Sequence, residues 1–533
     1  MSSMPASSAV PAGLEQATLR QWIERWAIER PQAPAILAED GPTGFDALHA
    51  RALALAGFLR ERGLGRGDII AAQLPNSIEF VLTFLASGYL GATLQTVHMP
   101  YRAAEIDPLL RHSKAKAFVG LARAKDFSPA ELALSLRATL PTLQQVIAVG
   151  AEPPAGAHAF PATESIPVAW SLPAPNAADR FLLLYTSGTT SAPKGVPIAY
   201  DKFLPNAALS ARELGVDHSS ILLSAAPFTH LYGLFSLHLA FATGAATALL
   251  PVFTPAALAA ALDRHRPTGI FVGPAHMAAC LNEGLLTSER LASLRFALIS
   301  GSNCPPELAR TVQERMPNGE VLQLWGMSEM QAGTFTRPGS DTAVRFETAG
   351  PATPQTELRV TVDDKAVPPG TEGELQVRGA SVFEGYLDNA EATAGAFTAD
   401  GWFRTGDLAR MDTSGNIRMT GRIKDVINRG GVKFNVADVE MLIDRHPAVA
   451  VSAIVPVPDP VLGERACCFV VLKPATKSLQ LAELTGWLAT QNVAKLKWPE
   501  RLEVLAEMPM TPTRKIMKGE LARRAAGKQG ARS

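Results

Sequence analysis

A hydroxyl-rich loop follows one of the most apolar short runs of the chain. The run Phe181-Leu-Leu-Leu-Tyr185 predicts a buried strand, and it leads directly into Thr186-Ser-Gly-Thr-Thr-Ser-Ala-Pro-Lys-Gly195. Hydroxyl groups, backbone N–H groups and one ammonium group are donors suited to the oxygens of a polyphosphate. The candidate phosphate ligands are Thr186, Ser187, Gly188, Thr189, Thr190 and Lys194.

Two other interpretations of this loop are weaker. A Walker A loop ends in Gly-Lys-Ser/Thr, whereas this loop ends in Pro193-Lys194-Gly195. A flexible Ser/Thr/Gly linker would not normally follow a fully apolar strand or contain a rigid Pro-Lys-Gly. The pattern therefore favours a phosphate loop of a different kind.

The loop resembles the signature of the adenylate-forming superfamily, which includes acyl-CoA synthetases, nonribosomal-peptide adenylation domains and firefly-type luciferases. The usual signature has Gly where this chain has Ser191. The resemblance extends over roughly residues 50–520, with further segments in the order that the family has them. These are Pro227–Gly233, Ser300–Pro305, Leu324–Glu329, Gly373–Gly379, Phe403–Leu408, Gly421–Lys433 and Pro509–Ile516.

The resemblance implies a nucleotide site in the first part of the chain. Gly301, Ser302 and Asn303 would form the turn beside adenine, where Gly301 leaves room for a flat base. Trp325 and Gly326 would flank the adenine, and Ser328 would contact a phosphate. Glu329 would bind Mg²⁺, which prefers hard oxygen ligands. The alternatives are an ordinary strand-to-helix turn at residues 301–303 and a core position for Trp325.

His230 is expected to be a gate beside the substrate carboxylate, although an isolated histidine is more often packed in a core. Amino-acid-activating relatives usually carry an Asp in this region to hold the ammonium group of the substrate. No Asp occurs between Ser224 and Phe241. We therefore expect an acid without an α-amino group, in a pocket for an apolar acyl body.

The last part of the chain is expected to supply mobile ligands. Asp407 would accept both ribose hydroxyls, Arg422 would contact ribose or phosphate, and Lys433 would add a further charge. Lys424 would be the hinge, and Gly430 and Gly431 would leave a narrow passage for the arm of coenzyme A. Lys515 would be the adenylation lysine.

Two of these matches depart from the family pattern, and each has a plainer alternative. Arg514 stands where the family usually has Gly, and Lys433 stands where amino-acid-activating relatives often have Arg. The alternatives are a plain Asp turn at Asp407, a surface charge run at residues 421–433, and an ordinary tail lysine at Lys515.

Composition excludes several other classes of protein. Lys plus Arg and Asp plus Glu both total 50, so the net charge is zero and nothing global favours nucleic acid or an anionic membrane. The four cysteines show neither metal spacing nor a C-x-x-C pair, which is typical of reduced thiols in the cytoplasm. No signal peptide is expected. The uncharged stretch Leu231–Leu250 is expected to be a buried helix and strand rather than a membrane span.

The 533 residues predict three or four domain-sized units of the α/β (α+β) class. We expect a large N-terminal domain over 1–420, made of layered α/β parts at about 14–180 and 181–345 and a small β-rich part at 346–420. Residues 421–533 would form a smaller mobile C-terminal α/β domain. Examples of the expected elements are a helix over 45–62, a strand over 69–74 and a helix over 77–88.

These features predict an AMP-forming acid–thiol ligase. It would use ATP and Mg²⁺ to convert an aromatic, alicyclic or medium-chain acid to acyl-AMP and pyrophosphate, and would then transfer the acyl group to coenzyme A. The alternatives are a stand-alone adenylation module that loads a carrier protein, a luciferase-like oxygenase and a degenerate nucleotide-binding protein. A homodimer is compatible with the sequence.

Overall fold

The computed structural model describes residues 17–165, 173–186, 194–429, 432–459, 462–474, 476–491, 493–511 and 514–527. Contacts between residues group the chain into two compact units. The first unit comprises Met1–Ser187, Pro193–Glu357 and Arg378–Gly395, and the second comprises Gly188–Ala192, Leu358–Val377 and Ala396–Ser533. The division thus places parts of the expected β-rich region in both units. The boundary near residue 420 and the hinge at Lys424 stay predictions.

The first unit begins with a mostly parallel sheet in the order β7-β6-β5-β3-β4-β8-β9. Its neighbouring strands run parallel except for β8 and β9, which form an antiparallel pair. The strands are β3 (Ile69–Gln73), β4 (Thr93–Thr96), β5 (Ala117–Leu121), β6 (Gln145–Val149), β7 (His158–Ala159), β8 (Arg180–Thr186) and β9 (Lys194–Ala199).

A second sheet of the first unit has the order β15-β14-β13-β12-β10-β11-β1-β2. Its inner strands run parallel, and only the outer pairs β1–β2 and β14–β15 are antiparallel. The strands are β1 (Pro34–Ala38), β2 (Gly41–Gly44), β10 (Ile221–Ser224), β11 (Ala246–Ala248), β12 (Gly269–Val272), β13 (Phe296–Ile299), β14 (Glu320–Met327) and β15 (Gln331–Phe335).

Helices alternate with these strands, as the βα rhythm of the sequence predicts. Local signals set their ends: α3 starts after Ser77, whose hydroxyl accepts the N–H of Phe80, and it stops at Gly91 in the left-handed conformation (φ 68°). The main helices of this unit are α1 (Leu19–Glu29), α2 (Phe45–Glu61), α3 (Ile78–Leu90), α4 (Ala103–Ser113), α5 (Pro129–Arg137), α6 (Tyr200–Glu213), α7 (Leu231–Thr243), α8 (Pro255–His265), α9 (Pro274–Asn282), α11 (Pro306–Gln313) and α13 (Ala390–Ala396).

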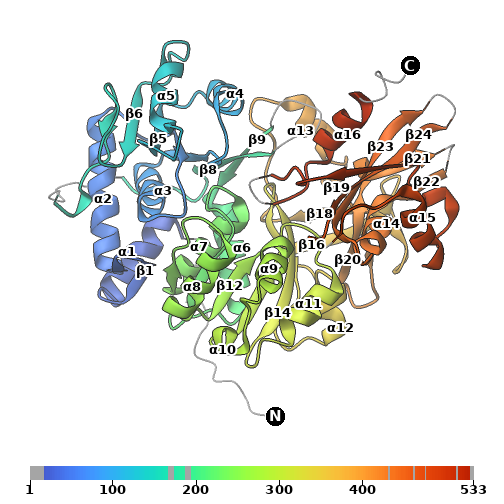
Figure 1. The fold of residues 1–533 in the computed structure, drawn as a ribbon. Coiled ribbons are helices and arrows are strands. Elements are labelled where there is room, and N and C mark those ends of the chain that lie inside the picture. The colour runs from blue at the N-terminus through green and yellow to red at the C-terminus, as the bar shows by residue number, and fades with distance from the viewer. Residues whose placement is uncertain are drawn as a thin grey trace. The chain divides into compact units, whose positions relative to one another are not determined.

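Helix α7 is buried along its whole length because both sheets of the first unit contact it. Tyr232 packs against Phe271 of β12, with ring centroids 5.9 Å apart, and its hydroxyl donates to the carbonyl of Leu298 in β13. On the other side of the helix, the ring centroids of His238 and Phe181 of β8 are 5.9 Å apart. In Figure 1, α7 lies beside α6. The expectation of a buried helix and strand for residues 231–250 is confirmed, with β11 as the strand.

His238 also joins α7 to the strand that follows the Trp325–Glu329 segment. Its Nδ1 lies 2.9 Å from Oε1 of Gln331, the first residue of β15. The Nε2 of Gln331 donates to the carbonyl of Phe203 and to Oδ1 of Asn206, both on α6. One buried polar network thus fixes the position of β15 relative to two helices. No helix among the described residues is long and apolar enough to cross a membrane.

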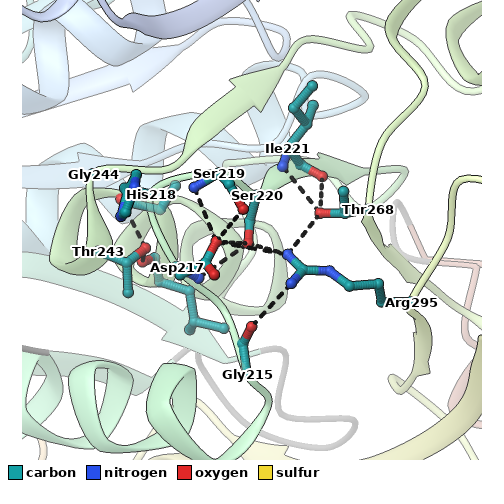
Figure 2. A network of polar contacts seen from close by, with 12 residues as sticks. Gly215, Asp217, His218, Ser219, Ser220, Ile221, Thr243, Gly244, Thr268 and Arg295 are labelled. Carbon is teal, nitrogen blue, oxygen red and sulfur yellow. Dashed lines mark hydrogen bonds and ion pairs between the residues drawn. The ribbon is translucent and has the colours of Figure 1, made fainter. Parts of the chain in front are cut away.

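A second polar network ties together the amino ends of three neighbouring strands. Ser220, Thr268 and Arg295 each precede the first residue of β10, β12 and β13 respectively. Figure 2 shows the guanidinium group of Arg295 directed at Ser220, Thr268 and Gly215, while Asp217 accepts the N–H and hydroxyl of Ser219. These contacts lie at the edge of the sheet opposite to the carboxyl ends of its parallel strands, so they hold the strands in register away from the candidate site.

The second unit is built on two further sheets. One has the order β17-β16-β18-β19-β20, and the other has the order β22-β21-β24-β23 with β25 paired to β24. The first of these is the small β-rich part that the expected fold includes, whereas its bounds at 346–420 stay a prediction. The strands are β16 (Thr356–Val362), β17 (Lys365–Ala366), β18 (Glu372–Gly379), β19 (Phe403–Met411), β20 (Ile417–Arg422), β21 (Val426–Arg429), β22 (Val432–Asn435), β23 (Val449–Asp459), β24 (Gly463–Leu472) and β25 (Arg501–Leu505).

Helices cover both faces of the last sheet. On one face, α14 (Val436–Ile443) and α15 (Leu481–Thr490) pack on Ile454 and Cys468. On the other face, α16 (Lys518–Gly527) packs on Val455 and Phe469. Alternation of side chains along β23 and β24 supplies apolar residues to both cores, as expected for a strand buried on two faces. The expected α/β fold with a smaller C-terminal α/β part is confirmed.

We predict that His238 makes the stability of the protein dependent on pH between 6.5 and 4. Complete burial lowers its pKa to about 4. Below pH 6.5 this histidine becomes protonated in the unfolded chain but stays neutral in the folded protein. The free energy of unfolding therefore decreases as the pH falls, by up to about 3 kcal/mol at pH 4. Thermal unfolding of wild type and His238→Phe at pH 7, 5.5 and 4.5 checks this. The variant should be less stable at pH 7 and should lose less on acidification; parallel pH profiles would contradict the assignment.

Candidate active site

The two ends of the hydroxyl-rich loop lie side by side. In the antiparallel pairing of β8 with β9, Thr186 is opposite Lys194 and Tyr185 is opposite Gly195. The paired strands therefore bring the two ends of the loop together, and Lys194 lies at one of these ends. Ser187, Gly188, Thr189 and Thr190, together with Ser191, lie outside the described residues, so their role as phosphate ligands stays a prediction.

Lys194 and Glu329 both contact Tyr386. The Nζ atom of Lys194 lies 4.7 Å from the centroid of the Tyr386 ring, and the Tyr386 hydroxyl donates to Oε1 of Glu329 at 3.1 Å. Two backbone bonds hold this arrangement: the N–H of Phe383 donates to the carbonyl of Glu329, and the N–H of Leu387 donates to the carbonyl of Gly195. Two residues predicted from separate motifs are thus brought together by a tyrosine.

Tyr386 was not among the residues predicted from the sequence. No spacing rule connects it to Glu329, because the two lie 57 positions apart and meet only after β14 and the segment 378–387 have packed. Burial, and next the negative charge of Glu329, raises the pKa of Tyr386 well above its usual range. The phenol therefore remains protonated and keeps donating to the carboxylate.

A small pocket lies close to the start of α7. Two imidazole rings line it: His230 and His98 are stacked with centroids 6.3 Å apart, and Nδ1 of His98 lies 2.9 Å from Oγ1 of Thr229. Burial lowers the pKa of His98 to about 4, so this ring is neutral near pH 7. The described residues of its lining are Thr96, His98, Tyr101, Leu109, Leu184, Tyr185, Thr229, His230, Leu231 and Ser328.

The structure places His230 at the amino end of α7. Its Nδ1 accepts the backbone N–H of Tyr232, so the ring caps the helix and faces the pocket. Ser328, predicted to touch a phosphate, lines the same pocket. His98 and Tyr101 were missed by the sequence reasoning, and they reach the pocket from the loop after β4. Their signal is only that this loop follows the carboxyl end of a parallel strand, where ligands usually bind.

The residues predicted to flank adenine lie in the turn after β13 and in the neighbouring strand β14. Ser302 and Asn303 are exposed in the turn after β13, where Gly301 adopts a left-handed conformation (φ 94°). Trp325 is 9% exposed in β14 and packs on Gly333, where an added Cβ would lie 2.5 Å from the indole ring. A Cβ at Gly326 would lie 2.0 Å from the carbonyl oxygen of Gln331. The glycine at 326 thus has a structural reason of its own, and adenine stacking by Trp325 stays a prediction.

The second unit brings together another predicted pair. Asp407 of β19 lies opposite Arg422 of β20, and Nε of Arg422 is 2.9 Å from Oδ1 of Asp407. Lys424 follows in a short 3₁₀ turn, where burial, and next the charge of Arg422, lowers its pKa. The backbone of Lys433 pairs with Asn428 in the hairpin of β21 and β22. The side chain of Lys433, and Gly430 and Gly431, lie outside the described residues.

Lys515 lies in a tight loop directly before α16. Arg514, beside it, has a left-handed backbone (φ 58°), which costs a residue with a side chain about 1 kcal/mol relative to glycine. This conformation gives a physical reason why the family usually has Gly there.

Comparison with known proteins agrees with these observations. A model of the AMP-binding enzyme family matches residues 23–387, and a model of the AMP-binding enzyme C-terminal domain matches residues 438–515. The chain belongs to the AMP-binding enzyme family. It is an AMP-forming acid ligase, which uses ATP to activate a carboxylic acid as an acyl-adenylate.

The matches of this AMP-binding enzyme to its relatives and to solved structures extend over nearly its whole length. It is 33% identical to a medium-chain fatty-acid–CoA ligase of Escherichia coli, over 94% of this chain and 89% of that protein. It is 34% identical to a salicyl-AMP ligase/salicyl-S-ArCP synthetase of Mycobacterium tuberculosis, over 95% of this chain and 88% of that protein. An anthranilate CoA ligase in complex with anthranoyl-AMP has a TM-score of 0.87 at 25% identity and covers 97% of this chain and 98% of its own.

We predict that Tyr386→Phe slows acyl-adenylate formation about tenfold, because Glu329 loses a hydrogen bond to a charged group worth roughly 1.5 kcal/mol. ATP–pyrophosphate exchange measures this rate. Tyr200→Phe is the matched control, since it removes another buried phenol hydroxyl, bonded to the carbonyl of Gly88, away from Glu329. Equal losses in the two variants would contradict a role for Tyr386 at the site.

Proposed function

We propose that this ligase forms the acyl-adenylate between Lys194 and Glu329 and then transfers the acyl group to the thiol of coenzyme A. The observation that carries the proposal is the convergence of Lys194 and Glu329 on Tyr386, close to a pocket lined by Ser328 and His230. A reaction between two anions requires positive charge and hydrogen-bond donors near the reacting atoms. Lys194 would supply a positive charge, Glu329 would hold Mg²⁺, and Ser328 would donate a hydrogen bond.

In the first half-reaction a carboxylate oxygen of the acid attacks the α-phosphorus of ATP, and the bond from that phosphorus to the β-phosphate oxygen breaks. The products are an acyl-AMP and pyrophosphate. Lys194 and Lys515 would offset the negative charge that gathers on the phosphates, and Ser328 would donate to a phosphate oxygen. Asp407 would hold the ribose hydroxyls and Arg422 would contact ribose or phosphate. These roles follow the chemistry of positioning and electrostatic stabilisation.

Glu329 fits a magnesium ligand. It is 5% exposed, one oxygen accepts from Tyr386, and no group of three His, Cys, Asp or Glu side chains among the described residues forms a metal cage. Magnesium at nucleotide sites is usually held by one or two carboxylates, with phosphate and water oxygens completing its six ligands. When bound, Mg²⁺ would supply positive charge to the polyphosphate.

In the second half-reaction the sulfur of coenzyme A attacks the acyl carbonyl, the bond to the AMP oxygen breaks, and the thiol proton is released. Lys515 has no task in this step. We propose that the last part of the chain turns about Lys424 between the two half-reactions, so that Gly430 and Gly431 replace Lys515 beside the acyl group. Glycines suit this passage because side chains would narrow it.

The pocket supports an acid with an uncharged body. The described part of its lining contains three leucines and two imidazoles but no Asp, Glu, Lys or Arg. A substrate ammonium group would lack a counter-charge there, which supports the expectation of an acid without an α-amino group. Among the relatives named above, one is a medium-chain fatty-acid ligase and one a salicyl-AMP ligase. An aromatic, alicyclic or medium-chain acid is the proposed substrate class.

The test of this proposal is pyrophosphate release with a panel of acids, using hydroxylamine to trap acyl-adenylates. The panel contains benzoate, salicylate, cyclohexanecarboxylate and octanoate, with phenylalanine as the amino-acid comparison. Consumption of coenzyme A with the best acid supports the proposed acceptor, whereas acyl-AMP formation without thioester formation would indicate a carrier protein. Absence of pyrophosphate release with every acid would overturn the proposal.

We predict that Lys515→Ala lowers the adenylation rate on the order of a hundredfold, the effect of losing one well-placed charge worth about 3 kcal/mol. Thioester formation from a supplied acyl-AMP should remain within twofold of wild type, and Lys424→Pro should show the reverse pattern. Lys477→Ala, an exposed lysine of the same unit, is the control and should change neither half-reaction. Equal loss of both half-reactions in Lys515→Ala would refute its assigned role.

A further inference from the structure

The loop that carries Lys515 is closed by its own hydrogen bonds. The N–H of Thr511 donates to the carbonyl of Lys515 at 2.7 Å, and the N–H of Lys515 donates to Oγ1 of Thr511 at 3.0 Å. Outside this pair, Met510 and Ile516 form an antiparallel bridge. Lys515 therefore sits in a small closed unit, and its direction depends on how that unit is attached to the rest of the second unit.

The next element, α16, is attached to the sheet mainly through apolar contacts. Leu521 and Ala525 are buried in a cluster with Val455 and Met508. Burial of apolar surface is non-directional, so it holds the helix on the sheet without specifying how the first turn is rotated or shifted along it. A directional contact near the beginning of the helix is needed to fix the loop.

Lys518 provides that contact. It is the first residue of α16 and lies three positions after Lys515. Its Nζ is 2.8 Å and 3.0 Å from the two carboxylate oxygens of Glu440 on α14, and 3.8 Å from Oδ2 of Asp425. Glu440 is itself held, because its Oε1 accepts the backbone N–H of Ile454 in β23 at 2.5 Å.

The burial of these groups makes the contact stronger than a surface ion pair. The side chains of Lys518, Glu440 and Asp425 are 22%, 15% and 23% exposed. Solvent and salt screen partly buried charges much less than exposed ones. Removing the ammonium group would leave two carboxylates near each other without their shared cation, so the cost would exceed the loss of one hydrogen bond.

The position of Lys518 is unfavourable for the helix on its own. A positive charge in the first turn opposes the helix dipole, which favours acidic residues at that end. Helix formation therefore does not explain a lysine there, whereas the two carboxylates facing it do. Asp425 is also the residue after Lys424, so the ammonium group links the loop of Lys515 to the segment expected to be the hinge.

We propose that Lys518 is a positioning residue for Lys515. Held by Glu440 and Asp425, it fixes the first turn of α16 and thereby the direction in which the 509–517 loop presents Lys515. It also makes the loop and Asp425, the residue that follows the hinge, move as one body when the hinge turns. This inference rests on the proposed role of Lys515 in adenylation. Lys518 itself contacts neither substrate in this account.

The experiment separates the two half-reactions in three variants. Lys518→Met keeps the aliphatic stem and removes the charge, Lys518→Arg keeps the charge, and Glu440→Gln keeps an acceptor for Ile454 while removing the negative partner. We expect Lys518→Met to slow ATP–pyrophosphate exchange on the order of tenfold. Thioester formation from supplied acyl-AMP should stay within twofold. Lys518→Arg should restore most of the exchange, and Glu440→Gln should show a smaller loss in the same direction.

Arg524→Met is the matched control, because it removes a basic residue paired with Glu520 on the exposed side of the same helix. It should leave both half-reactions unchanged. A purely structural role for Lys518 predicts equal losses in the two half-reactions, and that result would overturn the inference, as would unchanged exchange in Lys518→Met. If Lys518→Met does not fold, Glu440→Gln and Lys518→Arg give the same comparison.

The failure of this inference is distinguishable from failure of the proposed function. If wild type releases no pyrophosphate with any acid, the proposed function fails. If wild type is active and Lys515→Ala loses adenylation while Lys518→Met and Glu440→Gln do not, only the positioning role fails. The rate at which an amine-reactive acetylating reagent labels Lys515, followed by mass spectrometry, is a second measurement. It should change in Lys518→Met and stay unchanged in Arg524→Met.

Discussion

Repulsion between a carboxylate and a triphosphate is the constraint that shapes this protein, because both must reach bonding distance before any chemistry occurs. Lys plus Arg equals Asp plus Glu, so the chain as a whole provides no field that attracts anions. Compensation has to be local, and its value rises where water is excluded. In the proposed mechanism Lys194 supplies positive charge and Glu329 would hold the Mg²⁺ that supplies more, and Tyr386 contacts both side chains.

Neutral polar groups do most of this positioning work. His238, Gln331 and Asn206 form a buried network, and burial keeps the histidine uncharged near neutral pH. A network without net charge avoids the desolvation cost of a buried ion, yet its directional bonds fix β15 relative to α6 and α7. Because β15 pairs with β14, and Gly326 permits their close approach at Gln331, this network constrains the turn that contains Ser328 and Glu329.

Much of the fold and part of the site were predictable from the sequence, for physical reasons that differ between residues. Short apolar strands followed by capped helices specify a parallel sheet, and the uncharged stretch at 231–250 was recognised as a buried helix because it contains glycines and polar residues. Lys194, Glu329, Asp407 and Arg422 were predicted because the short motifs that contain them resemble those of the family, and the structure pairs the last two directly.

Tyr386 and His98 escaped prediction because their roles arise only from long-range packing. Tyr386 meets Glu329 from 57 positions away, and His98 meets Thr229 from 131 positions away. Nothing in the period or composition of their own segments distinguishes them from core aromatics. Trp325 is the opposite case, because its motif is specific but its ring packs on Gly333. A tryptophan buried in the core and a tryptophan that stacks on a base give the same sequence signal, so the sequence does not distinguish the two roles.

The ion pairs of the second unit differ in a way that suits the proposed movement of its last part. In the pair of Arg422 with Asp407 the guanidinium group is 47% exposed and the carboxylate only 8%, so in the proposed mechanism ribose hydroxyls would replace the guanidinium group while the carboxylate stays in place. Lys518 and Glu440 are 22% and 15% exposed, and a second carboxylate, that of Asp425, lies near the ammonium group. Breaking such a cluster would leave partly buried charges without their partners, which costs more free energy than breaking a surface ion pair. The pair of Arg422 and Asp407 is therefore suited to exchanging one partner for a substrate, and the cluster of Lys518, Glu440 and Asp425 is suited to staying intact. In the proposed movement this cluster would hold the loop of Lys515 unchanged between the two half-reactions.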